Sequence, residues 1–93
     1  MVIEMLGFQV PVAAQAGFIA LDAAIWTPAL ATSAGFLGKE VWFSGDDLRL
    51  VIRWRAQADW DAMDRGFLAA TQAEFVAALG ADYPVLSCTA FTA

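Results

Sequence analysis

Apolar and polar residues alternate most regularly between residues 35 and 55, and this alternation predicts two strands joined by a tight turn. In the second strand, one face is apolar and the other is rich in arginine, because successive side chains of a strand point to opposite faces. The apolar face carries Leu48, Leu50, Ile52 and Trp54, and the opposite face carries Arg49, Val51, Arg53 and Arg55. Gly45 and Asp46 lie at the centre of the turn, where glycine permits a positive φ and aspartate hydrogen-bonds its own backbone.

A pairing of Phe43 with Leu48 across this turn fixes the register of the predicted hairpin. The first strand then adds Leu37, Lys39, Val41 and Phe43 to the apolar face, and Phe36, Gly38, Glu40 and Trp42 to the arginine face. In this register Glu40 lies opposite Val51 and diagonal to Arg49 and Arg53, within reach of long side chains. We expect Glu40 and one of these arginines to form a structural ion pair.

The segment before the hairpin predicts a strand and then a long helix. Residues 2–10 alternate as a strand, with Glu4 on the same face as Leu6 and Phe8. Residues 12–32 show apolar positions at helical spacings of three and four. This predicted inner stripe consists of Val12, Ala16, Ile19, Ala23, Trp26 and Leu30. Pro28 is expected to kink or restart the helix, with Thr27 as the cap of the new turn.

The segment after the hairpin predicts two helices and a last strand. Residues 57–63 form a short helix, and Asp64 caps a second helix that runs to Leu79 with Leu68, Thr71 and Phe75 on its inner face. Gly80 is the expected C-cap. Residues 85–92 form the final strand and contain Cys88, which we expect to be a buried, unreactive thiol.

The order strand, helix, strand, strand, helix, strand predicts one ferredoxin-like α+β domain over residues 1–93, with an antiparallel four-stranded sheet. Both helices cover the face of Leu50, Ile52 and Trp54, so the arginine face stays bare in a single chain. Hydrophobic residues make up 60% of the chain and charged residues only 16%, so an uncovered sheet face favours a symmetric homodimer. The predicted dimer interface consists of Trp42, Glu40, Arg49, Val51 and Arg53.

Composition and charge exclude several function classes. A net charge of −5 argues against nucleic-acid binding, which needs a basic surface. The absence of histidine removes the usual general base, serine and cysteine triads and most zinc sites. Neither uncharged run, 5–21 or 23–38, has the ~20 predominantly apolar residues of a membrane span. A single cysteine indicates a cytoplasmic protein without an internal disulfide. We expect no metal, because the paired aspartates at 46–47 suit a turn and those at 59–64 suit a helix start.

Three segments together resemble the antibiotic biosynthesis monooxygenase group of the dimeric α/β-barrel superfamily. They are residues 35–41, the hairpin turn, and Arg53-Trp54 followed by the helix with Trp60. A fourth segment, residues 25–30 with the sequence Ile-Trp-Thr-Pro-Ala-Leu, is similar to a branch of small single-domain proteins within this group. The resemblance implies a ferredoxin-like dimeric barrel that binds or oxygenates a small aromatic molecule without a cofactor. Haem-degrading members use a histidine and tend to carry an asparagine in the first strand, and this chain has neither.

Two functional hypotheses follow. In the first, a pocket between sheet and helices holds a flat apolar molecule, with Trp26, Trp54 and Phe67 as walls and Tyr83 or Arg53 supplying polarity. In the second, the same aromatic residues are only core, and the protein is a non-catalytic binding or structural homodimer. A connected cavity favours the first hypothesis, whereas an interior filled to crystal density favours the second.

Overall fold

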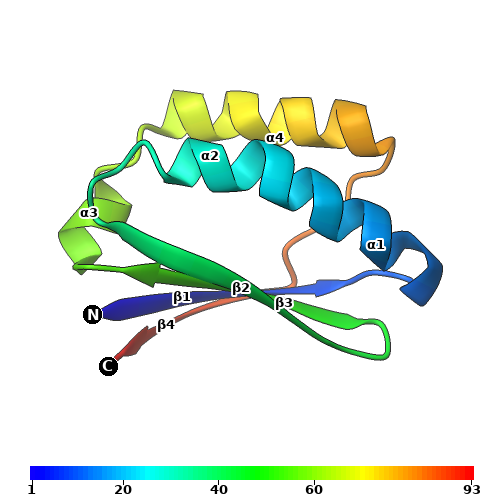
Figure 1. Ribbon diagram of the computed structural model, residues 1–93, viewed down its shortest axis with the longest axis horizontal. Coiled ribbons are helices and arrows are strands. Elements are labelled where there is room, and N and C mark those ends of the chain that lie inside the picture. Colours follow the sequence, from blue (N-terminus) through cyan, green and yellow to red (C-terminus); the bar gives the residue numbers. More distant parts are fainter.

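A four-stranded antiparallel sheet carries all the helices on one of its faces (Figure 1). The structure is a computed structural model that describes residues 1–93. Its strands are β1 (Val2–Gln9), β2 (Phe36–Ser44), β3 (Asp47–Trp54) and β4 (Ser87–Thr92), in the sheet order β2-β3-β1-β4. The predicted ferredoxin-like arrangement is confirmed, with the first and last strands paired and both termini at the same end of the sheet (Figure 1).

The hairpin of β2 and β3 has the predicted register over most of its length. Phe43 pairs with Leu48 and Glu40 with Val51, and Gly45 in the turn has a φ of 57°. At the far end a β-bulge shifts the register between Phe36 and Gly38. A bulge adds one residue to one strand and therefore reverses the alternation beyond it.

The bulge exchanges the predicted faces of two residues. Phe36, expected on the arginine face, packs on Trp54 with ring centroids 6.0 Å apart and the rings nearly perpendicular. Leu37, expected on the apolar face, is 56% exposed. The simple period-two extrapolation from the turn was therefore wrong for these two residues.

The first long helix is one continuous run made of α1 (Val12–Leu21), a π-helical turn η1 (Asp22–Trp26) and α2 (Thr27–Leu30). The predicted restart at Pro28 is wrong, because Thr27 has helical angles and its N–H bonds the carbonyl of Asp22 five residues earlier. The wider π-turn relieves the clash that a proline ring makes with the carbonyl four residues before it. The helix therefore passes Pro28 without a capped break.

The inner face of this helix also differs from the predicted apolar stripe. Val12 is 66% exposed, and Ala16 and Ala23 are exposed as well. The side chains that face the sheet include Gln15 and Asp22, which are 7% and 2% exposed. Polar residues thus replace part of the apolar stripe. Gln15, for example, donates to the Gly45 carbonyl at 2.6 Å and so ties the helix to the hairpin turn. The prediction is confirmed for Ile19, Trp26 and Leu30, which pack in or against the core clusters, and is wrong for the three exposed positions.

The second helical segment follows the prediction closely. The short α3 (Gln57–Asp61) precedes α4 (Arg65–Leu79). The Asp64 side chain accepts from the Phe67 N–H at 2.8 Å as the N-cap, and Gly80 ends the helix in the left-handed conformation with a φ of 75°. Thr71 and Phe75 are buried on the inner face, as the stripe predicts.

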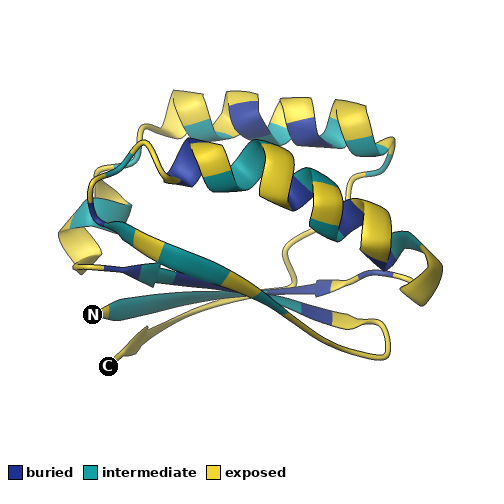
Figure 2. Ribbon diagram, viewed as in Figure 1, coloured by how far each residue is buried: buried dark blue, intermediate teal, exposed yellow.

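The core lies between the two layers, where buried residues of the strands and helices face one another (Figure 2). One cluster centres on Phe18, Leu48 and Phe75, and a second contains Leu30, Ile52 and Trp54. No element covers the other face of the sheet (Figure 1). The edge strand β4 is exposed along its whole length, and Cys88 with it, so the expectation of a buried thiol was wrong for the single chain.

The continuous helix Val12–Leu30 is long and apolar enough, by length and composition, to cross a membrane. Asp22 divides it into two uncharged halves, which the sequence pattern presents as separate runs. In the fold, the buried side chains of Asp22 and Gln15 both bind groups of the hairpin, Lys39 and the Gly45 carbonyl. This helix is therefore part of the two-layer domain, packed on the sheet.

Candidate functional site

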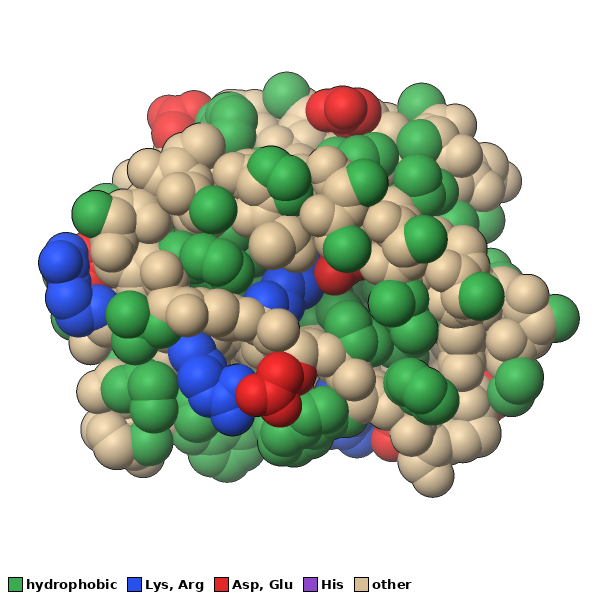
Figure 3. Space-filling model, viewed as in Figure 1, with side chains coloured by type: hydrophobic (Ala, Val, Ile, Leu, Met, Phe, Trp, Pro, Cys, Tyr) green, Lys and Arg blue, Asp and Glu red, His purple; other side chains and the backbone are tan.

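A cavity of about 440 Å³ lies between the helices and the sheet. Small-molecule pockets are typically ~300–1,000 Å³ in volume and are mostly apolar. Most of its lining residues are hydrophobic, and its aromatic residues are Phe8, Phe18, Trp26, Trp54, Trp60, Phe75 and Tyr83. The outer surface shows hydrophobic side chains in the hollow between the helical layer and the sheet (Figure 3). Helices and sheet thus leave a mostly apolar space between them that is large enough for a small molecule.

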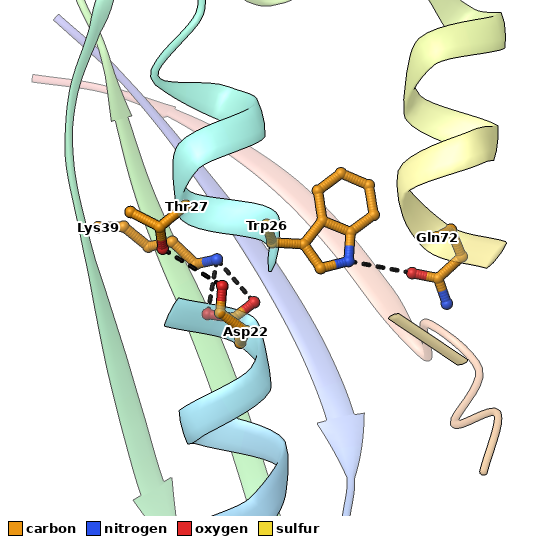
Figure 4. A network of polar contacts seen from close by, with 5 residues as sticks. All are labelled: Asp22, Trp26, Thr27, Lys39 and Gln72. Carbon is orange, nitrogen blue, oxygen red and sulfur yellow. Dashed lines mark hydrogen bonds and ion pairs between the residues drawn. The ribbon is translucent and has the colours of Figure 1, made fainter. Parts of the chain in front are cut away.

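Two tryptophans are fixed at the cavity wall by hydrogen bonds of their indole N–H groups. Trp26, from η1, donates to Gln72 Oε1 of α4 at 3.2 Å, which links the two long helices (Figure 4). Trp54, from β3, is fully buried and donates to Glu4 Oε1 of β1 at 3.0 Å. A buried indole usually finds an acceptor, and the bond sets the orientation of the ring. Both rings are therefore held in place before any ligand arrives.

A buried ion pair lies beside these rings. Lys39 Nζ of β2 binds both carboxylate oxygens of Asp22, at 2.6 and 2.7 Å, and the two side chains are only 5% and 3% exposed (Figure 4). Burial raises the pKa of Asp22 and lowers the pKa of Lys39, and their mutual attraction opposes both changes. The pair ties the π-helical turn to the edge strand of the hairpin.

The carboxyl of Glu4 is the second acidic group at the cavity. Burial raises its pKa, while the hydrogen bond from Trp54 and the charge of Lys39 act in the opposite direction. No hydrogen bond within the protein uses Oε2 of Glu4, since its one bond is made by Oε1. Glu4 therefore has an acceptor atom free for a ligand.

The residues predicted for the pocket divide into two groups. Trp26, Trp54 and Tyr83 line the cavity together. Phe67 does not, because it lies one position before the inner stripe of α4 and is 40% exposed. Arg53 does not either, because its side chain leaves β3 on the face away from the helices, where it pairs with Glu40.

The residues predicted for the dimer interface all lie on the bare face of the hairpin. The Trp42 indole donates to Glu40 at 2.9 Å, and Glu40 also binds Arg53, as the register predicts. These two bonds lower the pKa of Glu40, with the bond from Trp42 as the larger cause. Trp42 is 48% exposed, whereas Val51 is only 1% exposed in the single chain. Val51 is thus already covered and has little surface left for a second subunit.

Sequence reasoning missed the polar groups of the cavity, although each left a signal. Glu4 and Lys39 both occupy inward positions of strands that are otherwise apolar. Asp22 is the only charged residue between Met5 and Gly38. A charged residue at an inward position needs a buried partner. The partner of Asp22 depends on the packing of helix on sheet, and the partner of Glu4 depends on the pairing of β1 with β3. The pattern of one segment does not contain that information.

Neither a family model nor a curated protein matches the sequence, but solved structures match the fold. A monooxygenase from Streptomyces coelicolor, ActVA-Orf6 in complex with nanaomycin D, matches with a TM-score of 0.76 at 15% identity over 99% of this chain and 86% of that chain. The cofactor-independent oxygenase SnoaB from Streptomyces nogalater, in a mutant form, matches with a TM-score of 0.71 at 21% identity over 99% and 91%. The haem degrader MhuD from Mycobacterium tuberculosis, with two haems bound in its active site, matches with a TM-score of 0.71 at 20% identity over 100% and 95%. The chain shares the fold of the antibiotic biosynthesis monooxygenase-like group. These matches support the sequence resemblance as far as the fold is concerned.

Proposed function

We propose that the cavity between helices and sheet binds a small flat aromatic molecule. The observation that carries this proposal is a 440 Å³ space walled by two hydrogen-bonded tryptophans, with a free carboxylate oxygen beside them. Cores are normally packed to crystal density, so a space of this size favours the ligand hypothesis over a purely structural role. The alternative of a structural homodimer, in which the aromatic residues are only core, predicts that no aromatic compound enters.

We propose further that the bound molecule is oxygenated by O₂ without a metal or organic cofactor. Two of the proteins with this fold are described as a monooxygenase and a cofactor-independent oxygenase. In such a reaction a CH₂ group of an anthrone-like phenol becomes C=O, and the second oxygen atom of O₂ leaves as water. This chain contributes an apolar enclosure for the ring system and Glu4 as an acceptor for a ring hydroxyl proton.

Filling the cavity is expected to abolish binding. Ala69 lines the cavity from α4, so a large side chain there competes with the ligand for the same space. Ala69→Trp should lower the affinity for anthrone-like phenols more than about 10-fold, because each ~1.4 kcal/mol of lost contact is a factor of ten. Ala73→Trp is the matched control, since Ala73 is an exposed position of the same helix outside the cavity lining. Calorimetric titration measures both, and equal affinities in the two variants would reject the cavity as the binding site.

Oxygen uptake separates binding from catalysis. We expect the purified protein to consume O₂ when an anthrone-like phenol is added in air, and Ala69→Trp to consume less. Saturable binding without O₂ uptake above the uncatalysed rate would support the non-catalytic alternative. No binding by any phenol would reject both parts of the proposal.

We also propose that two chains form a homodimer through the uncovered sheet face, in the cytoplasm, as the single cysteine suggests. The face carries the half-exposed Trp42 and the pair of Glu40 with Arg53. Arg53→Glu places two like charges side by side and should shift the protein toward monomer in sedimentation velocity. Phe67→Ala, on the helical side, is the control and should leave the sedimentation profile unchanged. A particle of single-chain mass for the unaltered protein would contradict the dimer.

A further inference from the structure

The cavity offers no free positive charge to a ligand. Its charged lining residues are Glu4, Asp22, Asp82 and Lys39, and Lys39 already binds both oxygens of Asp22. The four arginines of the chain all lie outside the lining. An anionic ligand would therefore lose its hydration in an apolar space with excess negative charge, and that loss is costly when no partner compensates it. The charge of the cavity selects against anions.

Glu4 supplies a hydrogen-bond acceptor at a fixed position. Its Oε1 accepts from the Trp54 indole at 3.0 Å, and its Oε2 has no partner in the protein. No fully buried side-chain oxygen lacks a hydrogen bond in this structure, so Oε2 is accessible at the cavity. An ionised carboxylate only accepts hydrogen bonds. A ligand that displaces water from Oε2 must then offer a hydrogen-bond donor in its place.

We propose that Glu4 is the ligand-selecting residue, and that the cavity prefers uncharged aromatic molecules whose ring carries a hydroxyl or N–H donor directed at Glu4 Oε2. This inference rests on the proposed function and adds the chemical class of the ligand and the residue that recognises it. The donor takes the place of water at the half-buried carboxylate, and a hydrogen bond to a charged acceptor is stronger than one between neutral groups. Trp54 acts as a positioning residue, because its indole N–H holds Glu4 Oε1 in place.

The substitution Glu4→Gln is expected to abolish the preference. Trp54 still needs an acceptor, so the amide oxygen of the introduced side chain stays with the indole and its NH₂ group turns toward the cavity. A hydroxyl oxygen and an ether oxygen can both accept from this NH₂ group, so a ligand that donates loses its advantage over one that only accepts. A merely structural role for Glu4 would change stability but would not remove the difference between the two ligands.

Isothermal titration calorimetry with three matched probes tests this inference. 2-Naphthol carries a neutral donor, 2-methoxynaphthalene only an acceptor, and 2-naphthoate a negative charge on the same ring system. For the unaltered protein we expect 2-naphthol to bind about 10-fold more tightly than 2-methoxynaphthalene, in line with a charge-assisted hydrogen bond. We expect 2-naphthoate to bind most weakly. In Glu4→Gln the first two probes should bind with similar affinity, whereas Glu74→Gln, which changes an exposed carboxylate of α4 outside the cavity, should keep the preference for 2-naphthol.

The outcomes distinguish this inference from the proposed function. Tight binding of 2-naphthoate, or an undiminished preference for 2-naphthol in Glu4→Gln, would overturn the role of Glu4 while leaving an aromatic-binding cavity in place. No binding by any of the three probes would reject the cavity as a small-molecule site, and the inference with it. Thermal unfolding of Glu4→Gln checks that the variant is folded, and Ala69→Trp checks that the probes occupy this cavity.

Discussion

Lys39→Met is expected to destabilise the protein by about 3–5 kcal/mol at neutral pH, the cost of leaving one partner of a buried ion pair without the other. The substitution keeps a side chain of similar length on β2 but removes the only cation that binds Asp22. Asp22 is 2% exposed, so water does not replace the lost partner. Urea denaturation monitored by circular dichroism measures the change in the free energy of unfolding.

The pH dependence of this variant provides a second test. Without Lys39, burial alone acts on Asp22 and raises its pKa further above the unfolded value. The folded state then binds more protons than the unfolded state between the two pKa values, so stability falls as pH rises through this window. Lys39→Met should therefore regain stability when the pH is lowered from neutral toward the pKa of unfolded aspartate. A pH profile parallel to that of the unaltered protein would contradict the assignment of the lost energy to Asp22.

Two further variants serve as controls for the ion pair. The double variant Asp22→Leu/Lys39→Met removes both charges and should lose much less stability than Lys39→Met, because no unpaired charge remains buried. Arg55→Met breaks the exposed pair of Arg55 with Asp59 and should change stability little, since surface ion pairs contribute little. A double variant as unstable as Lys39→Met would indicate that side-chain packing, and not the unpaired charge, explains the loss.

Trp54→Ala is expected to cost about 3–5 kcal/mol, as is usual when a large buried aromatic side chain is truncated. Trp54 is fully buried, packs on Phe36 and binds Glu4. Trp42→Ala is the matched control on the same hairpin, because Trp42 lies on the other face of the sheet and is 48% exposed. At a concentration where the chain is monomeric, the control should lose about 1 kcal/mol or less. Equal losses in the two variants would contradict the assignment of the two faces.

The two tryptophan variants should also differ in ligand binding. Trp54→Ala removes a wall of the cavity and the donor that holds Glu4, so the titrated affinity for aromatic probes should fall. Trp42→Ala leaves the cavity lining unchanged and should keep this affinity. Loss of binding in Trp42→Ala alone would place the site on the uncovered face of the sheet.

Local sequence patterns predicted the helices and strands and most of the strand pairing in the hairpin. The alternation around Leu50 and Trp54 specified which face of β3 meets the helices, because a strand has a side-chain period of two. The turn at Gly45 and the caps at Asp64 and Gly80 depend on the backbone preferences of single residues, so the sequence contains them in full. The bulge between Phe36 and Gly38 was not predictable in this way, because it depends on how the end of β2 meets Trp54 of the neighbouring strand.

The sequence alone determined the topology of this protein, the bare face of its sheet and three aromatic residues of its cavity, since these follow from periodicities and turn signals within single segments. Only the tertiary structure decided that Lys39 meets Asp22, that Glu4 meets Trp54, and that Arg53 and Phe67 lie outside the cavity. The physical reason is that a buried charge is stable only beside a partner. Each of these partners comes from a different element, so the site exists only when β1 and β3 are paired and the helix is packed on the sheet.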